Sequence, residues 1–406
     1  MQLSLRHGAA IWLAGALSAL AAISGDARAE DGVDLGTTVF HETGGPLHMT
    51  VLVPSANASV DLGEAVSVRA GWTADIVSGA SVAVVDAPAA NIDAISSATV
   101  TDTRHAFSGH VDLHDGLSTL ELGYTHAFEN DYLSNAFDVT ARTDLFDRDT
   151  TLSLSYARGF DEVCDVAGSF DPVMKPRMDS SNGCFSDAKL HAERDLAVHT
   201  WQAAWSQAWT PVLTMQLGAS AQLLHGFQSN PYRAVLIGKT AAQEHHPNER
   251  ARYGVGGGLR LWIVPLSGAL SGSTRIYRDT WDMTSVMGEA AYEQSIFAGL
   301  RLRARGRYYT QGGVSFYSDD YVLVPRGQYF TGDRELSPMR SLLVGGQALW
   351  TVPPKDDGKI LNFLAGLELT VKVDLLHTYF SDFHYDRAPV PNNSALIGSV
   401  ELHAMF

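Results

Sequence analysis

Apolar and polar residues alternate one by one in segment after segment of this chain. Residues 213–222 alternate without a break, residues 361–374 do so with one interruption at Leu364, and the pattern recurs at 253–263. A period of two is typical of a β-strand, because successive side chains point to opposite faces of the strand. The alternation therefore predicts an all-β protein in which each strand has one apolar and one polar face.

The connections between these segments are of two lengths. Short turns at one end of the strands and long loops at the other are typical of an outer-membrane barrel. A strand that crosses a membrane must pair all its backbone groups, and only a closed barrel does this without leaving an open edge. The predicted fold is therefore a transmembrane antiparallel β-barrel. The short turns lie at 61–64, 114–116, 147–150, 210–212, 265–268 and 353–359, and the long loops near 78–98, 161–187, 228–248, 316–333 and 380–394.

The number of strands follows from parity. About fifteen candidate strands lie between Leu47 and Phe406. If the short turns face the periplasm, the first of these strands runs inward, whereas a mature N-terminus starts in the periplasm. One more strand, VDLGTTVFHE at 33–42, corrects the parity. We expect about sixteen strands, or about fourteen if two weak segments are loops. Residues 30–406 contain no linker or low-complexity tract, which predicts a single barrel domain.

The first 29 residues have the features of a secretory signal peptide. Arg6 precedes an apolar run from Ala9 to Ile23, and the small residues Ala27 and Ala29 frame a cleavage site. A membrane anchor is the alternative interpretation, but the run is short for a spanning helix. The segment 1–29 therefore predicts export, and with the barrel pattern it predicts the outer membrane of a Gram-negative cell.

Two further features fit an exported barrel. The last segment, LIGSVELHAMF, alternates and stops on Phe406, which looks like the signal read by the bacterial barrel-insertion machinery. The chain contains two cysteines, Cys164 and Cys184, and an oxidising compartment favours a disulfide between them. A free or catalytic pair is the alternative, but residues 165–183 have the composition of an irregular loop.

Arginine occupies every second position of the segment LRLRARGRYYTQ at 300–311, and we call Arg301, Arg303, Arg305 and Arg307 the arginine ladder. Charge on the lipid-facing side costs about 2–4 kcal/mol per Arg near the bilayer midplane, so the ladder should face the lumen. The same rule selects polar positions on other strands. The candidate lumen-lining residues are the ladder with Arg252, Arg260, Arg275, Glu289, Glu293, Glu368, Lys372 and Asp374, then Arg69, Asp75, His110, Asp112, His114, Asp138, Arg142 and Asp144 on early strands, and Glu401 and His403 on the last.

Two interpretations of the arginine ladder remain open. The ladder could form a basic stripe that faces an acidic stripe, and the field between the two would select small polar or ionic solutes. The arginines could instead pair with Glu289, Glu293 and other acids in a salt-bridge network that fills the interior. A wide barrel can use both, since a paired wall can also be its constriction.

Other functions find little support. The chain is acidic, with 45 Asp and Glu against 29 Lys and Arg, which argues against nucleic acid as a partner. A serine hydrolase would need Ser, His and an acid together, and no pattern joins His105 to Ser108 or Ser180 to Asn182, so we predict no enzyme. We also predict no cofactor and assign no metal site to the histidine-containing segments, which lie at 110–115, 244–250 and 381–386.

Three segments, at 91–105, 273–296 and 303–321, resemble a recognised family, and the most specific feature is Tyr-Tyr-x-Gln followed by Phe-Tyr-x-Asp. The chain resembles the bacterial proteins grouped as domain of unknown function 3570, which are predicted outer-membrane barrels. The resemblance runs over nearly all of the mature chain, and the cysteine loop and the histidine count depart from it. It implies a role beside extracytoplasmic redox or metal handling, with a lipoprotein or redox protein as partner.

The favoured function is a passive or gated channel for a small polar or ionic solute, embedded in outer-membrane lipid. The alternative is a non-conducting barrel that acts as scaffold or sheath for a periplasmic redox or lipoprotein partner.

Overall fold

The computed structural model describes residues 31–43, 49–79, 83–86, 93–96, 102–166, 175–176, 191–231, 233–237, 240–318, 327–352, 364–385 and 388–406. The predicted signal peptide, Ser180, Asn182, Cys184 and the expected turn at 353–359 lie outside these described residues.

Sixteen strands of the described chain close into one antiparallel barrel, which confirms the predicted fold and the higher of the two predicted strand numbers. Each strand pairs with the next barrel strand along the chain, and the last strand pairs with the first. The strands are β1 (Gly32–Glu42), β2 (Met49–Asp61), β3 (Val66–Gly79), β6 (Asp102–Asp115), β7 (Ser118–Phe128), β8 (Tyr132–Leu145), β9 (Thr150–Val166), β10 (His191–Thr210), β11 (Leu213–Gly226), β14 (Glu249–Ile263), β15 (Gly268–Asp279), β16 (Thr284–Phe297), β17 (Leu300–Gln311), β18 (Met339–Val352), β19 (Gly366–Phe380) and β22 (Asn392–Met405).

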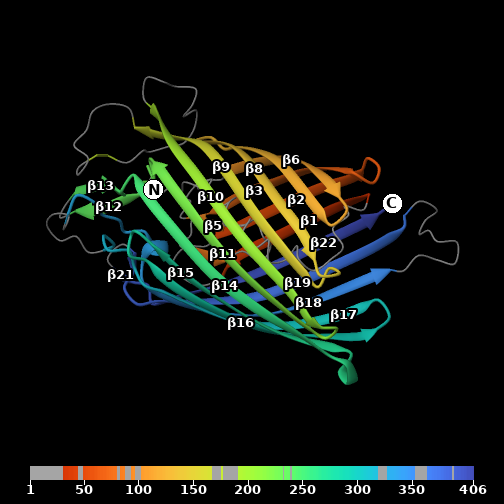
Figure 1. The fold of residues 1–406 in the computed structure, drawn as a ribbon. Coiled ribbons are helices and arrows are strands. Elements are labelled where there is room, and N and C mark those ends of the chain that lie inside the picture. Colours follow the sequence, from red (N-terminus) through yellow and green to blue (C-terminus); the bar gives the residue numbers. More distant parts are fainter. Residues whose placement is uncertain are drawn as a thin grey trace.

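Smaller elements lie between the barrel strands. In Figure 1 the short turns gather at the end of the barrel that carries the C-terminus, and the hairpin β12–β13 lies at the other end. No helix among the described residues is long and apolar enough to span a bilayer. The described small elements are the hairpins β4 (Ala83–Asp86) with β5 (Asp93–Ser96), β12 (Ala234–Ile237) with β13 (Thr240–Gln243) and β20 (His384–Tyr385) with β21 (Ala388–Pro389), and the 3₁₀ turns η3 (Val264–Leu266) and η4 (Arg334–Leu336).

Two boundaries differ from the expected ones. Residues 161–166, expected to begin a loop, continue β9, because β10 extends equally far and pairs Val166 with His191. The strand expected from 361 begins at Gly366, because its partner β22 ends at Met405, the residue opposite Gly366. Residues 361–363 lie outside the described part of the chain.

The apolar residues of the alternating pattern form an exposed band around the barrel. Leu302 and Tyr308 of β17, Val255 of β14 and Leu375 of β19 are all exposed, although they are large and hydrophobic. Leaving such surface in water costs about 25 cal/mol per Å². A band of this kind is therefore suited to contact with the hydrocarbon interior of an outer membrane.

Candidate functional site

The arginine ladder lies on β17, between β16 and β18, on the face opposite the exposed Leu302 and Tyr308. The neighbouring strand β16 and the more distant strand β19 supply carboxylates to this face, whereas β18 contains none. Glu289 of β16 is the most shared of them, since it lies 3.5 Å from Arg303, 3.4 Å from Arg305 and 2.9 Å from Arg307. One carboxylate therefore contacts three successive arginines of the ladder.

Arg305 has a second partner from two strands away. Its Nε and Nη2 donate to the two oxygens of Asp374 at 2.9 and 2.7 Å, a bidentate geometry that favours arginine. Gly345 of β18 faces both residues, and a Cβ at Gly345 would collide with the Asp374 carboxylate. The glycine therefore lets a carboxylate of β19 reach across β18 to β17. Lys372 adds a contact to Asp374 at 3.7 Å.

The ladder becomes more exposed toward the short-turn end of the barrel. The side chains of Arg305 and Arg307 are 10% and 11% exposed, whereas that of Arg301 is 44% exposed. Arg301 lies only at the limit of ion-pair distance, 3.9 Å from Glu293 and 4.0 Å from Glu368. The ladder therefore has a tightly paired half and a half with accessible guanidinium groups.

Arg260 of β14 extends this accessible half. Its Nη2 donates to Glu293 at 3.0 Å, and half of its side chain is exposed. Glu293 is thus shared between Arg260 and Arg301 across β15 and β16. The structure brings Arg260, Glu293 and Glu368 together with the ladder.

Two other predicted residues stand apart from this group. Arg252 donates to Gln222 of β11 at 3.1 Å. Arg275 on β15 lies opposite Gly256 and makes no ion pair with a described residue. Cys164 is buried near the end of β9, and because Cys184 lies outside the described residues the disulfide stays a prediction.

A second charged group lies on β3, β6, β7 and β8. Arg69 donates to both oxygens of Asp112, at 2.8 and 3.0 Å, and to Glu121 at 2.5 Å. His110 and Asp138 complete the group, and His110 Nδ1 lies 3.3 Å from Glu121.

Other predicted positions pair separately. His114 bonds to Ser67 at 2.6 Å, and Arg142 lies 3.8 Å from Asp144. His403 bonds to Asp34 of the first strand at 2.5 Å.

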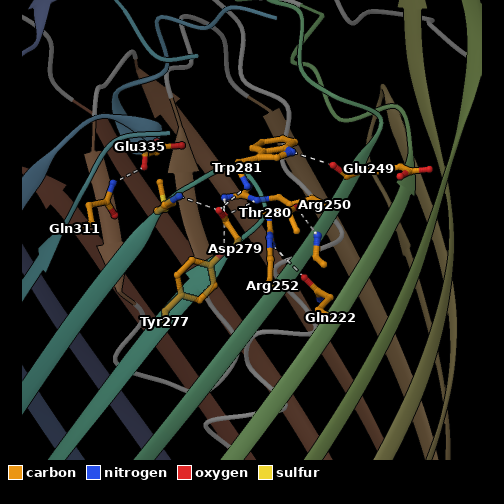
Figure 2. A network of polar contacts seen from close by, with 12 residues as sticks. Gln222, Glu249, Arg250, Arg252, Tyr277, Asp279, Thr280, Trp281, Gln311 and Glu335 are labelled. Atoms are coloured by element: carbon orange, nitrogen blue, oxygen red, sulfur yellow. Dashed lines mark hydrogen bonds and ion pairs between the residues drawn. The ribbon is translucent and has the colours of Figure 1, made fainter. Parts of the chain in front are cut away.

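The end of the wall opposite the short turns carries a buried polar network (Figure 2). Arg250 pairs with Asp279, and its guanidinium lies 4.0 Å above the ring of Trp281. Tyr277 donates to the same carboxylate at 2.8 Å, and the indole of Trp281 donates to the carbonyl of Glu249 at 2.9 Å. The start of β14 is thereby fixed to the β15–β16 turn.

A second buried cluster joins two loops next to this network, where the ring of His246 contacts that of Trp281. We call this cluster the loop clamp, and it consists of Arg233, Glu244, His246, Thr331 and Asp333. Arg233 pairs with Asp333 and lies 3.8 Å from Glu244. Glu244 accepts a hydrogen bond from Thr331 at 2.8 Å and lies 3.3 Å from His246. The clamp therefore connects the β11–β14 loop to the β17–β18 loop with buried charges.

A family model described as a protein of unknown function, DUF3570, matches residues 5–357. The chain belongs to the DUF3570 family. This confirms the resemblance found in the sequence. No curated protein matches the chain.

Solved structures similar to this DUF3570 protein are outer-membrane proteins. The siderophore receptor PirA of Acinetobacter baumannii is 8% identical with a TM-score of 0.46, over 93% of this chain and 60% of that one. A bacterial polysaccharide outer membrane secretin is 8% identical with a TM-score of 0.48, over 93% and 100%. OccD3 of Pseudomonas aeruginosa is 10% identical with a TM-score of 0.40, over 94% and 93%. The DUF3570 chain thus spans 60% of the receptor's length, and the likeness is one of fold.

The loop clamp of the DUF3570 protein should respond to acid. Burial would raise the pKa of Glu244, but the charges of His246 and Arg233 and a hydrogen bond from Asn230 hold that pKa at about 2, below its usual value. A lowered pKa stabilises the clamp above the ordinary glutamate pKa of about 4.3, and this contribution is lost as pH falls toward the folded value.

We expect the amide protection factors of the two clamped loops to fall when pH drops from about 5 to about 2.5. Hydrogen exchange, corrected for intrinsic rates, measures this. The Glu244→Gln variant should show a flatter profile over the same range, and equal slopes in both proteins would contradict the assignment.

Sequence patterns missed part of these sites. The paired histidines of segment 244–250 mark it as a candidate site. No pattern predicts that Glu244 lies in one cluster with Asp333, a residue of another loop. Glu121 was not selected either, although its position on the alternating strand 118–128 could have identified it. The pair His105 and Ser108 lies on opposite faces of β6, since residues three apart in a strand point to opposite sides.

Proposed function

We propose that this DUF3570 barrel is an outer-membrane channel for small polar or ionic solutes, with the arginine ladder lining its lumen. The observation that carries the proposal is the accessibility of Arg301 and Arg260, whose side chains are 44% and 50% exposed on the face opposite the apolar band. Buried, fully paired arginines would only hold the wall together. Accessible arginines present guanidinium groups that a solute in the lumen can contact.

The two halves of the ladder have different roles in this proposal. Arg305 and Arg307 hold β16, β17 and β19 together through Glu289 and Asp374. Arg301 and Arg260, with Glu293 between them, place both signs of charge at one level of the wall. Such an arrangement attracts anions and orients dipolar solutes.

We also infer how the chain reaches the membrane. Residues 1–29 serve as a cleaved signal peptide, and the last strand, β22, with Phe406 directly after it, is recognised by the barrel-insertion machinery. In support, Phe406 is exposed, and its backbone nitrogen donates to Asp31 at 2.9 Å beside the closing pair β1–β22.

Conductance in a planar bilayer tests the channel. The Arg301→Gln/Arg303→Gln variant should shift the reversal potential in a KCl gradient toward potassium, with the chloride-to-potassium permeability ratio at least about twofold lower. Arg278→Gln is the matched control, because Arg278, the second-to-last residue of β15, is exposed on the same outward face as Ile276.

Two outcomes would count against the proposal. Absence of current through the folded barrel would favour the alternative of a non-conducting scaffold for a periplasmic redox or lipoprotein partner. Current with unchanged selectivity in the double variant would confine the ladder to a structural role.

A further inference from the structure

Three side chains with metal-binding atoms converge on three adjacent strands. His110 of β6 lies opposite Gly123 of β7, and Gly123 in turn lies opposite Asp138 of β8. Glu121 precedes Gly123 by two residues and points to the same face. The register of β6, β7 and β8 therefore brings an imidazole and two carboxylates to one place.

The separations of these atoms are those of ligands around one ion. His110 Nδ1 lies 3.3 Å from Glu121 Oε1 and 3.9 Å from Asp138 Oδ2, and the three ligand atoms lie within 4.8 Å of one another. Two ligands at about 2.1 Å from a tetrahedral zinc ion lie about 3.4 Å apart. We propose that His110, Glu121 and Asp138 form a binding site for a divalent transition-metal ion.

The ring nitrogen that faces the carboxylates supports this assignment. His110 Nδ1 is buried, and neither carboxylate meets the geometry of a hydrogen bond to it. A buried imidazole nitrogen that lacks a well-aligned hydrogen bond is costly, and the nearest group to this nitrogen is the Glu121 carboxylate at 3.3 Å. An ion between the three groups would accept its lone pair.

Gly123 creates the space for this convergence. A Cβ at Gly123 would collide with the carboxylate of Asp138, which lies over the backbone of the middle strand. With glycine there, Asp138 reaches across β7 toward His110, 3.9 Å away. The same device serves Asp374 at Gly345, where the carboxylate reaches an arginine instead.

The surrounding charges leave a deficit of positive charge. Arg69 contacts Asp112 and Glu121, and Asp138 is the third carboxylate of the group. Arg69 binds Glu121 through Oε2, which leaves Oε1 directed at His110. One guanidinium thus faces three carboxylates, and a divalent cation would balance the remainder. Arg69 also fixes the orientation of Glu121, as outer hydrogen bonds commonly do for metal ligands.

The ligand set indicates the class of ion. One imidazole nitrogen with two carboxylate oxygens suits Zn²⁺ or Mn²⁺ better than Ca²⁺ or Mg²⁺, which prefer oxygen ligands alone. Three protein ligands leave a fourth position open for water or an exchanging group. A site with three protein ligands and one open position is suited to reversible binding of the ion.

Calorimetric titration of the refolded full barrel in detergent with Zn²⁺, repeated with Mn²⁺ and Mg²⁺, tests the proposal. His110→Ala and Asp138→Asn should each weaken Zn²⁺ binding at least about tenfold. Gly123→Ala should weaken it similarly, although it removes no ligand, because it displaces Asp138. His114→Ala is the matched control, since His114 lies on the same strand and bonds to Ser67 instead.

Binding that is absent, or that is equally strong in all four variants, would overturn the site. A Co²⁺-loaded barrel gives a second measurement, since the visible absorption of four-coordinate Co²⁺ should disappear in His110→Ala and persist in His114→Ala. The heat-dependent gel shift of each variant shows that it has folded. Because these measurements need no current, they can succeed or fail independently of the channel function.

Discussion

Replacing Asp374 with Asn should lower the free energy of unfolding of the barrel by about 3–5 kcal/mol. The Asp374 side chain is 1% exposed and accepts two hydrogen bonds from Arg305. The substitution keeps the shape of the side chain but leaves the guanidinium of Arg305 without its bidentate partner in a buried position. Equilibrium unfolding of vesicle-inserted barrel in guanidinium chloride, followed by tryptophan fluorescence, measures the loss.

Asp34→Asn is the matched control. Asp34 also faces an ion-pairing partner, His403, but its side chain is 52% exposed, and exposed pairs contribute at most about 1 kcal/mol. Replacing Arg305 and Asp374 together with leucine should recover much of the loss, because apolar residues remove both buried charges. If Asp374→Asn and Asp34→Asn lower the free energy of unfolding equally, the buried pair of Arg305 and Asp374 stabilises the barrel no more than an exposed pair does.

Replacing Arg233 with Met should open the loop clamp. It leaves Glu244 and Asp333 buried without their cation, and losing one partner of a buried pair costs about 3–5 kcal/mol. We expect protection from hydrogen exchange to fall at least about 100-fold at the amides of His245 and Phe330, which bond to each other's carbonyls at 3.0 and 2.9 Å.

The effect should stay local. The barrel strands keep the backbone hydrogen bonds between them, so the midpoint of global unfolding should change little. Arg278→Met, which removes an exposed arginine from the outward face of β15 near its end, should leave the protection of both amides intact. Unchanged protection in Arg233→Met would show that the backbone bonds between the loops need no buried charges.

The alternation of apolar and polar residues explains why so much of the fold could be predicted from the sequence. Each strand of a membrane barrel must separate lipid-facing from inward-facing residues, so the alternation at 300–311 determined both the strand and its faces. Strand number followed from parity, and residues 32–42 became β1. These features depend on each strand separately, without knowledge of its neighbours.

Contacts that depend on register could not be predicted. Arg305 was expected to meet acids of the adjacent strand 284–295, and it contacts Glu289, but its bidentate partner is Asp374, two strands away. That contact requires the alignment of three strands and a glycine at 345. The loop clamp is harder still, because Glu244 and Thr331 are 87 residues apart in segments without periodicity.

The pairing of β1 with β22 has a consequence for the order of assembly. Most pairs join strands that follow each other in the chain, but the closing pair joins residues as distant as Asp34 and His403, 369 positions apart. Contacts of such separation form late. Until then β1 and β22 each present an open edge, the state most prone to aggregation. Pairing of the final strand with the first therefore removes the last open edges. Until that point the nascent protein depends on other proteins to keep those edges from aggregating.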